Sequence, residues 1–148
     1  MTASVMVKSV LLDTSVLVAA LVQSHPEHGR AILWLQRVQQ KECIGSISAH
    51  SLAELYSVLT GHFRASPAAV RNIVETELVA HFQIVTLSEA DYLSVLVNAE
   101  LHDIRGGTIF DGIIACAAWK TEVDMLLTLN RKHFERLSPD RAEQIAEP

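Results

Sequence analysis

Short apolar runs separated by longer segments of helical periodicity set the pattern of this chain. Four runs are brief, rich in Val, Ile or Leu, and bounded by polar residues, at 5–12, 43–47, 83–87 and 125–129. Continuous apolar runs of this length are typical of strands that are buried on both faces of a sheet. We therefore predict four strands at these positions.

The intervening segments repeat their apolar residues at the spacing of a helix. This periodicity predicts helices over 15–22, 31–40, 48–61, 66–78, 88–101 and 108–121. Ser66 before Pro67 is typical of a helix start, Ser88 with Asp91 resembles a capping box, and Gly61 fits a helix stop. After residue 130 the chain is polar, with a weak apolar set at Phe134, Leu137 and Ile145.

Strands that alternate with helices predict an α/β fold, because neighbouring parallel strands need crossover connections. We expect a three-layer α/β/α arrangement around a central, mostly parallel sheet of four to five strands. The 148 residues, 49% of them hydrophobic, fit a single domain over 1–148.

Composition narrows the possible functions. The net charge of −5 argues against a protein that holds nucleic acid by bulk electrostatics. Cys43 and Cys116 lie too far apart in sequence to suggest a zinc knuckle or a redox pair, which favours a reduced cytoplasmic setting. Asp13 interrupts the apolar N-terminal stretch, so we predict neither an export signal nor a membrane span.

Acidic and amide side chains recur at the edges of the apolar segments. Asp13 ends the first strand, and Asn130 follows the last predicted strand, so the two should share the carboxyl edge of the sheet, where ligands bind in open α/β folds. Asp13 could equally be a helix N-cap. Glu54 lies within one helical turn of the second strand, and Asp111 lies in the first turn of the most hydrophobic helix.

Three acids directed at one edge of the sheet need a compensating charge. A helix N-terminus could stabilise Asp111 and partly Glu54, but it does not explain why three carboxylates converge. Like charges raise each other's pKa unless a cation lies between them, and hard oxygen ligands suit Mg²⁺ or Mn²⁺. The pattern predicts a divalent metal site at Asp13, Glu54 and Asp111.

Four segments in this order resemble the PIN-domain ribonucleases, and within them the VapC toxins of type II toxin–antitoxin pairs. They are Leu-Leu-Asp13-Thr-Ser, Ser-Leu-Ala-Glu54-Leu-Tyr, Thr-Ile-Phe-Asp111-Gly-Ile, and Leu-Thr-Leu-Asn130-Arg. The resemblance spans about the first 137 residues. It implies a PIN-like fold and an Mg²⁺- or Mn²⁺-dependent endoribonuclease acting on cellular RNA such as tRNA or rRNA. The protein would be a cytoplasmic homodimer neutralised by a VapB-type antitoxin.

The resemblance also implies roles for individual residues. Asp13 and Asp111 would bind the metal, and Glu54 would complete its coordination shell or orient the attacking water. Asn130 stands where the family often has a fourth acid, which removes one negative charge. Thr14, Ser15 and Thr128 could donate hydrogen bonds to the shell, or could simply cap strand and helix ends.

Several surrounding residues have two interpretations. Arg105, Arg131, Lys132, His133 and Arg136 could receive phosphates or form a solvated surface, and we interpret the seven histidines as surface residues. Val16, Leu17, Leu21, Trp34 and Leu35 offer apolar surface to an antitoxin, although core packing accounts for most of them.

Three other classes remain open. A haloacid-dehalogenase-like phosphatase would need a second Asp where this chain has Ser15, and a receiver-like domain would need paired acids and a Lys after a late strand. A PIN-like protein that only binds a partner is favoured by Asn130 and disfavoured by the three acids.

Overall fold

A five-stranded parallel sheet forms the centre of the molecule. In this computed structural model, which describes residues 6–148, its strands run in the order β3-β2-β1-β4-β5, and every neighbouring pair is parallel. The strands are β1 (Ser9–Leu12), β2 (Ile44–Ser48), β3 (Gln83–Val85), β4 (Met125–Leu127) and β5 (Ile145–Ala146). The predicted α/β class and central sheet are confirmed.

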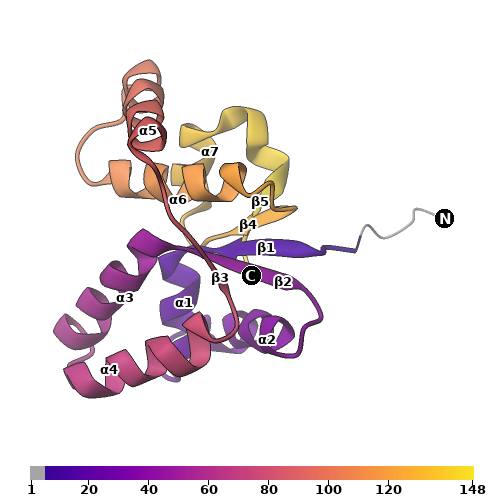
Figure 1. Ribbon diagram of the computed structural model, residues 1–148, viewed down its shortest axis with the longest axis vertical. Helices are drawn as coiled ribbons and strands as arrows, with labels where there is room; N and C mark the ends of the chain where they lie inside the picture. Colours follow the sequence, from indigo (N-terminus) through magenta and orange to yellow (C-terminus); the bar gives the residue numbers. More distant parts are fainter. Residues whose placement is uncertain (1–5) are drawn as a thin grey trace.

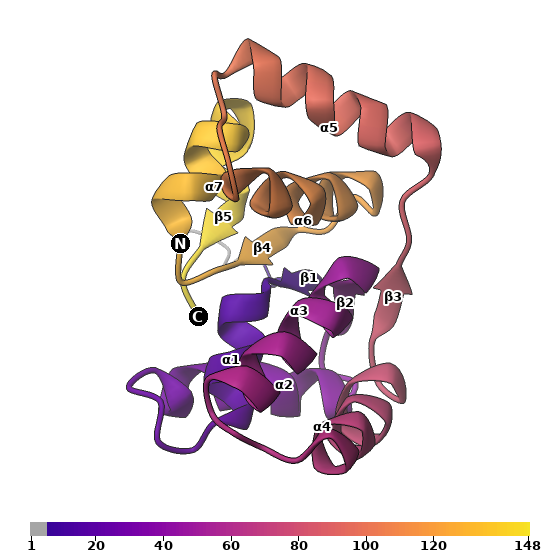
Figure 2. The same ribbon diagram turned by 90° about the vertical axis from the view of Figure 1, so that its left-hand side faces the viewer.

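Helices cover both faces of the sheet, as Figures 1 and 2 show. On one face lie α1 (Thr14–Leu21), α2 (His28–Gln39), α3 (Ala49–Gly61) and α4 (Pro67–Ile73), the last continued by a π-helical segment, Val74–Val79. On the other lie α5 (Glu89–Leu101), α6 (Thr108–Lys120) and α7 (Arg131–Leu137), followed by a short 3-10 helix, Pro139–Gln144. None of the helices in the described part of the chain is long and apolar enough to cross a bilayer.

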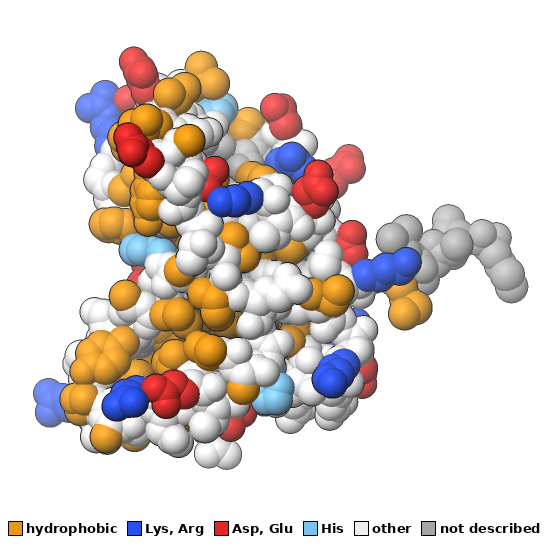
Figure 3. Space-filling view, in the orientation of Figure 1, with side chains coloured by type: hydrophobic (Ala, Val, Ile, Leu, Met, Phe, Trp, Pro, Cys, Tyr) orange, Lys and Arg blue, Asp and Glu red, His pale blue; other side chains and the backbone are white. Residues whose placement is uncertain are grey.

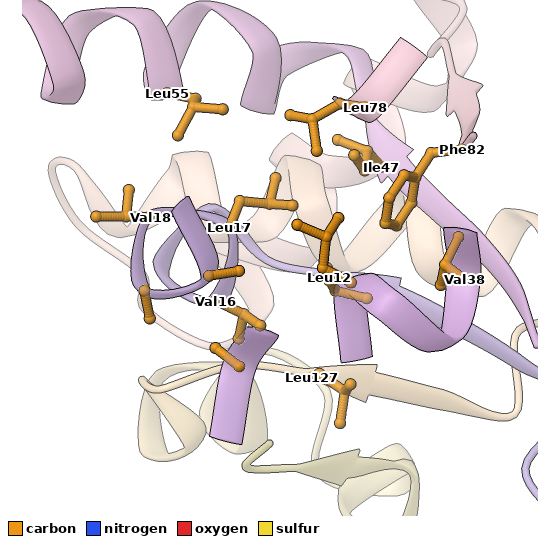
Figure 4. Packing of buried hydrophobic residues seen from close by; sticks show 14 of the residues in the cluster. Leu12, Val16, Leu17, Val18, Val38, Ile47, Leu55, Leu78, Phe82 and Leu127 are labelled. Carbon is orange, nitrogen blue, oxygen red and sulfur yellow. The ribbon is translucent and has the colours of Figure 1, made fainter. Parts of the chain in front are cut away.

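The hydrophobic core is divided in two by the sheet. Successive side chains of a strand point to opposite faces, so Leu12 packs with α1 to α4 while Leu11 packs with α6 and α7. Figure 4 shows the first cluster, where Leu17, Leu55 and Phe82 meet around the strands. Both faces of the central strand are therefore buried, as its apolar run predicts.

The register between β1 and β4 determines where the two strands end relative to each other. Leu12 pairs with Leu127, and the next residue, Asp13, donates its backbone N–H to the Leu127 carbonyl at 2.9 Å. The two strands therefore end at the same height, which places the residues that follow them side by side.

Local sequence signals account for several boundaries. The Ser66 hydroxyl accepts from Ala69 N, and Ser88 and Asp91 form the reciprocal capping box expected from their spacing. The helix α3 ends at Gly61, where the sequence predicts a stop, although the left-handed conformation falls on Arg64, with a φ of 56°. The first strand begins only at Ser9, and Val5 lies outside the described residues.

Two other interpretations of apolar residues are settled by burial. Val16, Leu17 and Leu35 are at most 3% exposed, and Leu21 and Trp34 pack partly buried against them, so these residues form core rather than a free surface. Phe134, Leu137 and Ile145 are at most 2% exposed, so the apolar set that looks weak in the sequence contributes fully to the core.

Candidate functional site

A cavity of about 370 Å³ opens at the carboxyl edge of the sheet, between the helix layers. In Figure 3 this edge faces left, where the surface is notched between α3 and α6 and a histidine and an acidic side chain lie together. The residues that line the cavity are Asp13, Thr14, Ser15, Val18, His25, Glu54, Val58, Asp111, Leu129 and Asn130. The four residues predicted to share a site, Asp13, Glu54, Asp111 and Asn130, are thus brought together.

Asp13 has two structural roles at once. It is the N-cap of α1, where its Oδ1 accepts from the Thr14 backbone N–H at 2.8 Å. It also lies directly after β1 on the wall of the cavity, and it is only 2% exposed. The cap and the sheet-edge interpretations are therefore compatible, because Oδ1 serves the helix and Oδ2 serves the site.

Two hydroxyl groups fix the second carboxylate oxygen of Asp13. Ser15 Oγ donates to Asp13 Oδ2 at 2.7 Å and Thr128 Oγ1 donates at 2.9 Å. The same hydroxyl oxygens accept the backbone N–H groups of Leu129 and Asn130, at 3.0 and 2.9 Å. Ser15 and Thr128 thus orient the carboxylate and tie α1 and β1 to the chain that leaves β4.

Thr14 differs from the other two hydroxyl residues. Its Oγ1 donates to Ser51 Oγ at 2.9 Å, so it links α1 to α3, and only its backbone N–H reaches Asp13. Of the three hydroxyl groups predicted to donate near the site, those of Ser15 and Thr128 therefore donate to Asp13, and that of Thr14 does not.

Burial dominates the electrostatics of Asp13. Loss of solvent raises the pKa of its carboxyl group from 3.8 to about 6; the hydrogen bonds from Ser15 and Thr128 oppose this, and the charges of Asp111 and Glu54 add to it. An ionised carboxylate is thus disfavoured at this position unless positive charge is supplied.

Asp111 and Glu54 approach the cavity from the two helix layers. Asp111 lies in the first turn of α6, as predicted, and burial raises the pKa of its carboxyl group, while His133 opposes that rise. Glu54 is the sixth residue of α3, so the prediction that it lies within one turn of β2 is wrong. The helix N-terminus is too distant to compensate it.

Histidines interpreted from the sequence as surface residues lie beside these acids, and none of the seven is buried. His133 Nδ1 lies 3.2 Å from Asp111 Oδ2, and His50 Nε2 lies 3.3 Å from Glu54 Oε2. His25 lines the cavity itself. The spacing of His50 and Glu54, four residues apart on one helix, is a signal that the sequence contains. His133 and Asp111 meet only through the tertiary fold.

Asn130 occupies the N-cap position of α7, but its side chain makes no capping hydrogen bond. It lines the cavity together with the three acids. Its amide oxygen is a neutral donor that suits a hard cation or a water.

The donor set fits Mg²⁺ or Mn²⁺ in an open arrangement. Among residues 6–148, no group of three or more His, Cys, Asp or Glu side chains is placed closely enough to hold a metal ion by itself. Mg²⁺ does not require one, because it keeps several waters and is often bound by one or two carboxylates together with substrate phosphates. Oxygen donors around a carboxylate with a raised pKa are consistent with such a site.

The basic residues near the site are partly engaged with protein groups. Arg131 pairs with Glu135 at 2.6 Å, Arg105 pairs with Asp103 at 3.0 Å, and Arg136 donates to the Asp103 carbonyl at 3.1 Å. Their pairing favours the solvated-surface interpretation for these three, while Lys132 lies exposed beside Asn130.

Residues 10–138 match the model of the PIN domain family, and the match includes all four predicted site residues. The chain belongs to the PIN-domain family. Its relatives include Ribonuclease VapC27 of Mycobacterium tuberculosis, which is 29% identical over 110 residues, or 72% of this chain and 74% of the relative. This PIN domain is thus a distant homologue of the VapC ribonuclease toxins.

Solved structures share its fold. The PIN domain superposes on VapC20 of M. tuberculosis, a sarcin–ricin-loop-cleaving toxin, with a TM-score of 0.64 at 17% identity, covering 79% of this chain and 86% of the other. It superposes on VapBC2 of Rickettsia felis, bound to a promoter DNA fragment, with a TM-score of 0.63 at 23% identity, covering 94% and 97%. The second of these neighbours is a toxin–antitoxin complex.

Proposed function

We propose that this PIN domain is a metal-dependent endoribonuclease of the VapC type that cuts phosphodiester bonds of cellular RNA in the cytoplasm. The observation that carries the proposal is the cavity lined by Asp13, Glu54 and Asp111. No lysine or arginine is among the described residues that line it. A phosphodiester is itself anionic, so these acids can work on it only with a cation between them.

The residues divide the work as follows. Asp13 and Asp111 would hold Mg²⁺ or Mn²⁺, which supplies the charge that polarises the phosphate and lowers the pKa of water. Glu54, which is 31% exposed at its side chain, would complete the shell or accept a proton from the attacking water. Asn130 would position a water or a phosphate oxygen without adding charge.

Ser15 and Thr128 prepare the site before substrate arrives. Both hydroxyls donate to Asp13 Oδ2, which fixes the direction in which its remaining lone pairs point. Such outer partners are as much a part of a metal site as its ligands, because they orient the donor and tune its basicity.

The same proposal extends to protein partners. A VapB-type antitoxin would cover the acidic cavity, and a homodimer would use an apolar helix surface. The outer side of α5 supplies one: Leu93, Leu96, Val97 and Leu101 are 55–76% exposed. Contiguous exposed apolar residues favour a protein interface over solvent.

Incubation of the purified protein with tRNA and rRNA tests the activity. We expect cleavage with Mg²⁺ or Mn²⁺, none with EDTA, and a loss of at least about 100-fold in Asp13→Asn and Asp111→Asn, since each removes a ligand charge. Asp91→Asn, on α5, is the matched control and should cut like the wild type. Equal cutting by all variants, or cutting that survives EDTA, would contradict the proposal.

A further inference from the structure

Two aromatic rings stack next to residues that line the acidic cavity. The rings of His50 on α3 and Phe110 on α6 lie 5.3 Å apart between centroids, with an angle of 10° between their planes. The two helices belong to opposite layers of the fold, as Figure 2 shows. The stack therefore bridges the layers at the edge where the site lies.

Each ring is attached to one of the proposed metal-binding acids. Phe110 immediately precedes Asp111 on α6, and His50 Nε2 contacts Glu54 Oε2 at 3.3 Å. Consecutive Cα atoms are about 3.8 Å apart, so Phe110 and Asp111 lie at the same end of α6. The stack is thus fixed beside the reaction centre by the same elements that position the acids.

Phe110 keeps 47% of its surface exposed, although one side of its ring faces His50. It is the most exposed of the four phenylalanines: Phe134 is 0% exposed, Phe82 is 6% exposed and Phe63 is 38% exposed. A flat apolar ring that stays in solvent next to carboxylates and histidines is unusual packing, and it offers a stacking surface close to where a phosphate would lie.

We propose that Phe110, backed by His50, is a platform on which an unpaired nucleobase next to the scissile phosphate stacks. This inference rests on the proposed ribonuclease function and adds a residue that would position the RNA next to the scissile bond. Unpaired bases are free to stack on aromatic side chains, whereas bases inside an A-form helix are not. Stacking on one ring is tolerant of sequence, because every base has a π-face.

The alternative occupant is an aliphatic side chain of a protein partner. The polar groups beside the ring favour the base: His50 stacks on Phe110, Glu54 contacts His50, and Asp111 follows Phe110 on α6. The apolar residues typical of a protein interface gather instead on the outer side of α5. A polar surround with one exposed ring matches nucleic-acid recognition better than it matches a hydrophobic hot spot.

The test uses single-stranded oligonucleotides that span a site cut by the wild type. We expect Phe110→Ala to raise KM by roughly tenfold to a hundredfold with a smaller change in kcat, Phe110→Leu to behave like Ala, and Phe110→Trp to restore binding. The same order should appear in fluorescence anisotropy when the variants are combined with Asp13→Asn to block cutting. Phe63→Ala is the control: Phe63 is 38% exposed, contacts His62 edge-on, and lies at the far end of α3.

A substrate with one base removed separates stacking from other effects. An abasic nucleotide at the stacked position should weaken wild-type binding as much as Phe110→Ala does, and should cost the Phe110→Ala variant nothing more. Equal KM values for wild type, Phe110→Ala and Phe110→Trp, or an abasic penalty that persists in Phe110→Ala, would overturn the platform while leaving the ribonuclease activity standing. If the wild type neither cuts nor binds RNA, the proposed function fails and the platform with it.

Discussion

Two cavities of about the same volume, 370 Å³, lie in different parts of this PIN domain, and their acids are in opposite situations. Between α5 and α6, Asp91 receives a hydrogen bond from Lys120 Nζ at 2.7 Å and another from Ser88 N at 2.8 Å. At the carboxyl edge of the sheet, Asp13 receives hydrogen bonds from two hydroxyls and one amide, and from no cationic side chain in the described part of the chain.

The pKa values of the two carboxyl groups move in opposite directions. The Lys120 hydrogen bond, helped by the backbone of Ser88, lowers the pKa of Asp91, whereas burial raises that of Asp13 to about 6. Cavity volume does not distinguish the two places. What distinguishes them is that the charge of Asp91 is balanced by Lys120, while Asp13 has no cationic hydrogen-bond partner among the described residues.

Replacing the two acids should shift stability in opposite directions. In Asp13→Asn, the free energy of unfolding at pH 8 without metal should rise by about 2–3 kcal/mol, because each unit of pKa shift corresponds to about 1.4 kcal/mol. Because the pKa of Asp13 is raised in the folded state, its protonated form stabilises the fold. This contribution is fully present below pH 3.8 and is lost as the pH rises through about 6. The gain should therefore vanish at pH 4, as urea titrations at the two pH values would measure.

Asp91→Asn is the matched control for that experiment. Because the pKa of Asp91 is lowered in the folded state, its ionised carboxylate stabilises the fold at any pH above the ordinary pKa of an aspartate. This contribution is lost as the pH falls through the pKa of the folded state. The variant should consequently be less stable than the wild type at pH 8, by a smaller amount, since solvent reaches the side chain of Asp91, which is 24% exposed, and screens its interactions. Destabilisation of both variants at pH 8 would remove the contrast between the cavities.

Thr128→Val sharpens the comparison without altering the charge. The side chain is fully buried and nearly isosteric with Val, and its hydroxyl both donates to Asp13 and accepts from Asn130 N. Loss of these bonds leaves Asp13 less well oriented, and we expect metal affinity to fall by roughly tenfold. Calorimetric titration with Mn²⁺ measures this. Thr121→Val, on the far end of α6, should bind Mn²⁺ like the wild type.

Asn130→Asp should give the smallest effect. A fourth carboxylate at the cavity adds attraction for a dication at a partly solvated position, so we expect metal affinity to rise roughly fivefold at low ionic strength. The gain should shrink in high salt. An unchanged affinity in the same calorimetric titration would mean that Asn130 does not face the bound ion.

Sequence patterns anticipated the fold where the determinants are local. The apolar run ending at Leu12, the capping box at Ser88 and the periodicity of α6 need only neighbouring residues, and all correspond to observed elements. The strand Ile145–Ala146 could not be predicted in this way, because two residues carry no periodicity and are ordered by pairing with β4. The π-helical turns after α4 were likewise invisible, since one turn is too short to separate two helical periods.

The candidate site was predictable to the same extent. An acid at the end of the first strand and acids predicted near two helix starts identified Asp13, Asp111 and Glu54 as neighbours, because parallel strands end at a common edge. Glu54 lies farther along its helix than the sequence predicts. The partner of Asp111, His133, is 22 residues away and follows a different strand. No pattern of spacing could have joined them, and the same holds for the ring of His50 over Phe110.

The outermost strands of the sheet, β3 and β5, are three and two residues long. Such short margins expose few unpaired backbone N–H and carbonyl groups, and so offer little template on which a foreign chain could extend the sheet or a fibril could nucleate. Association with other proteins must then depend on side chains of the helices, where single substitutions can change the partner without disturbing the sheet.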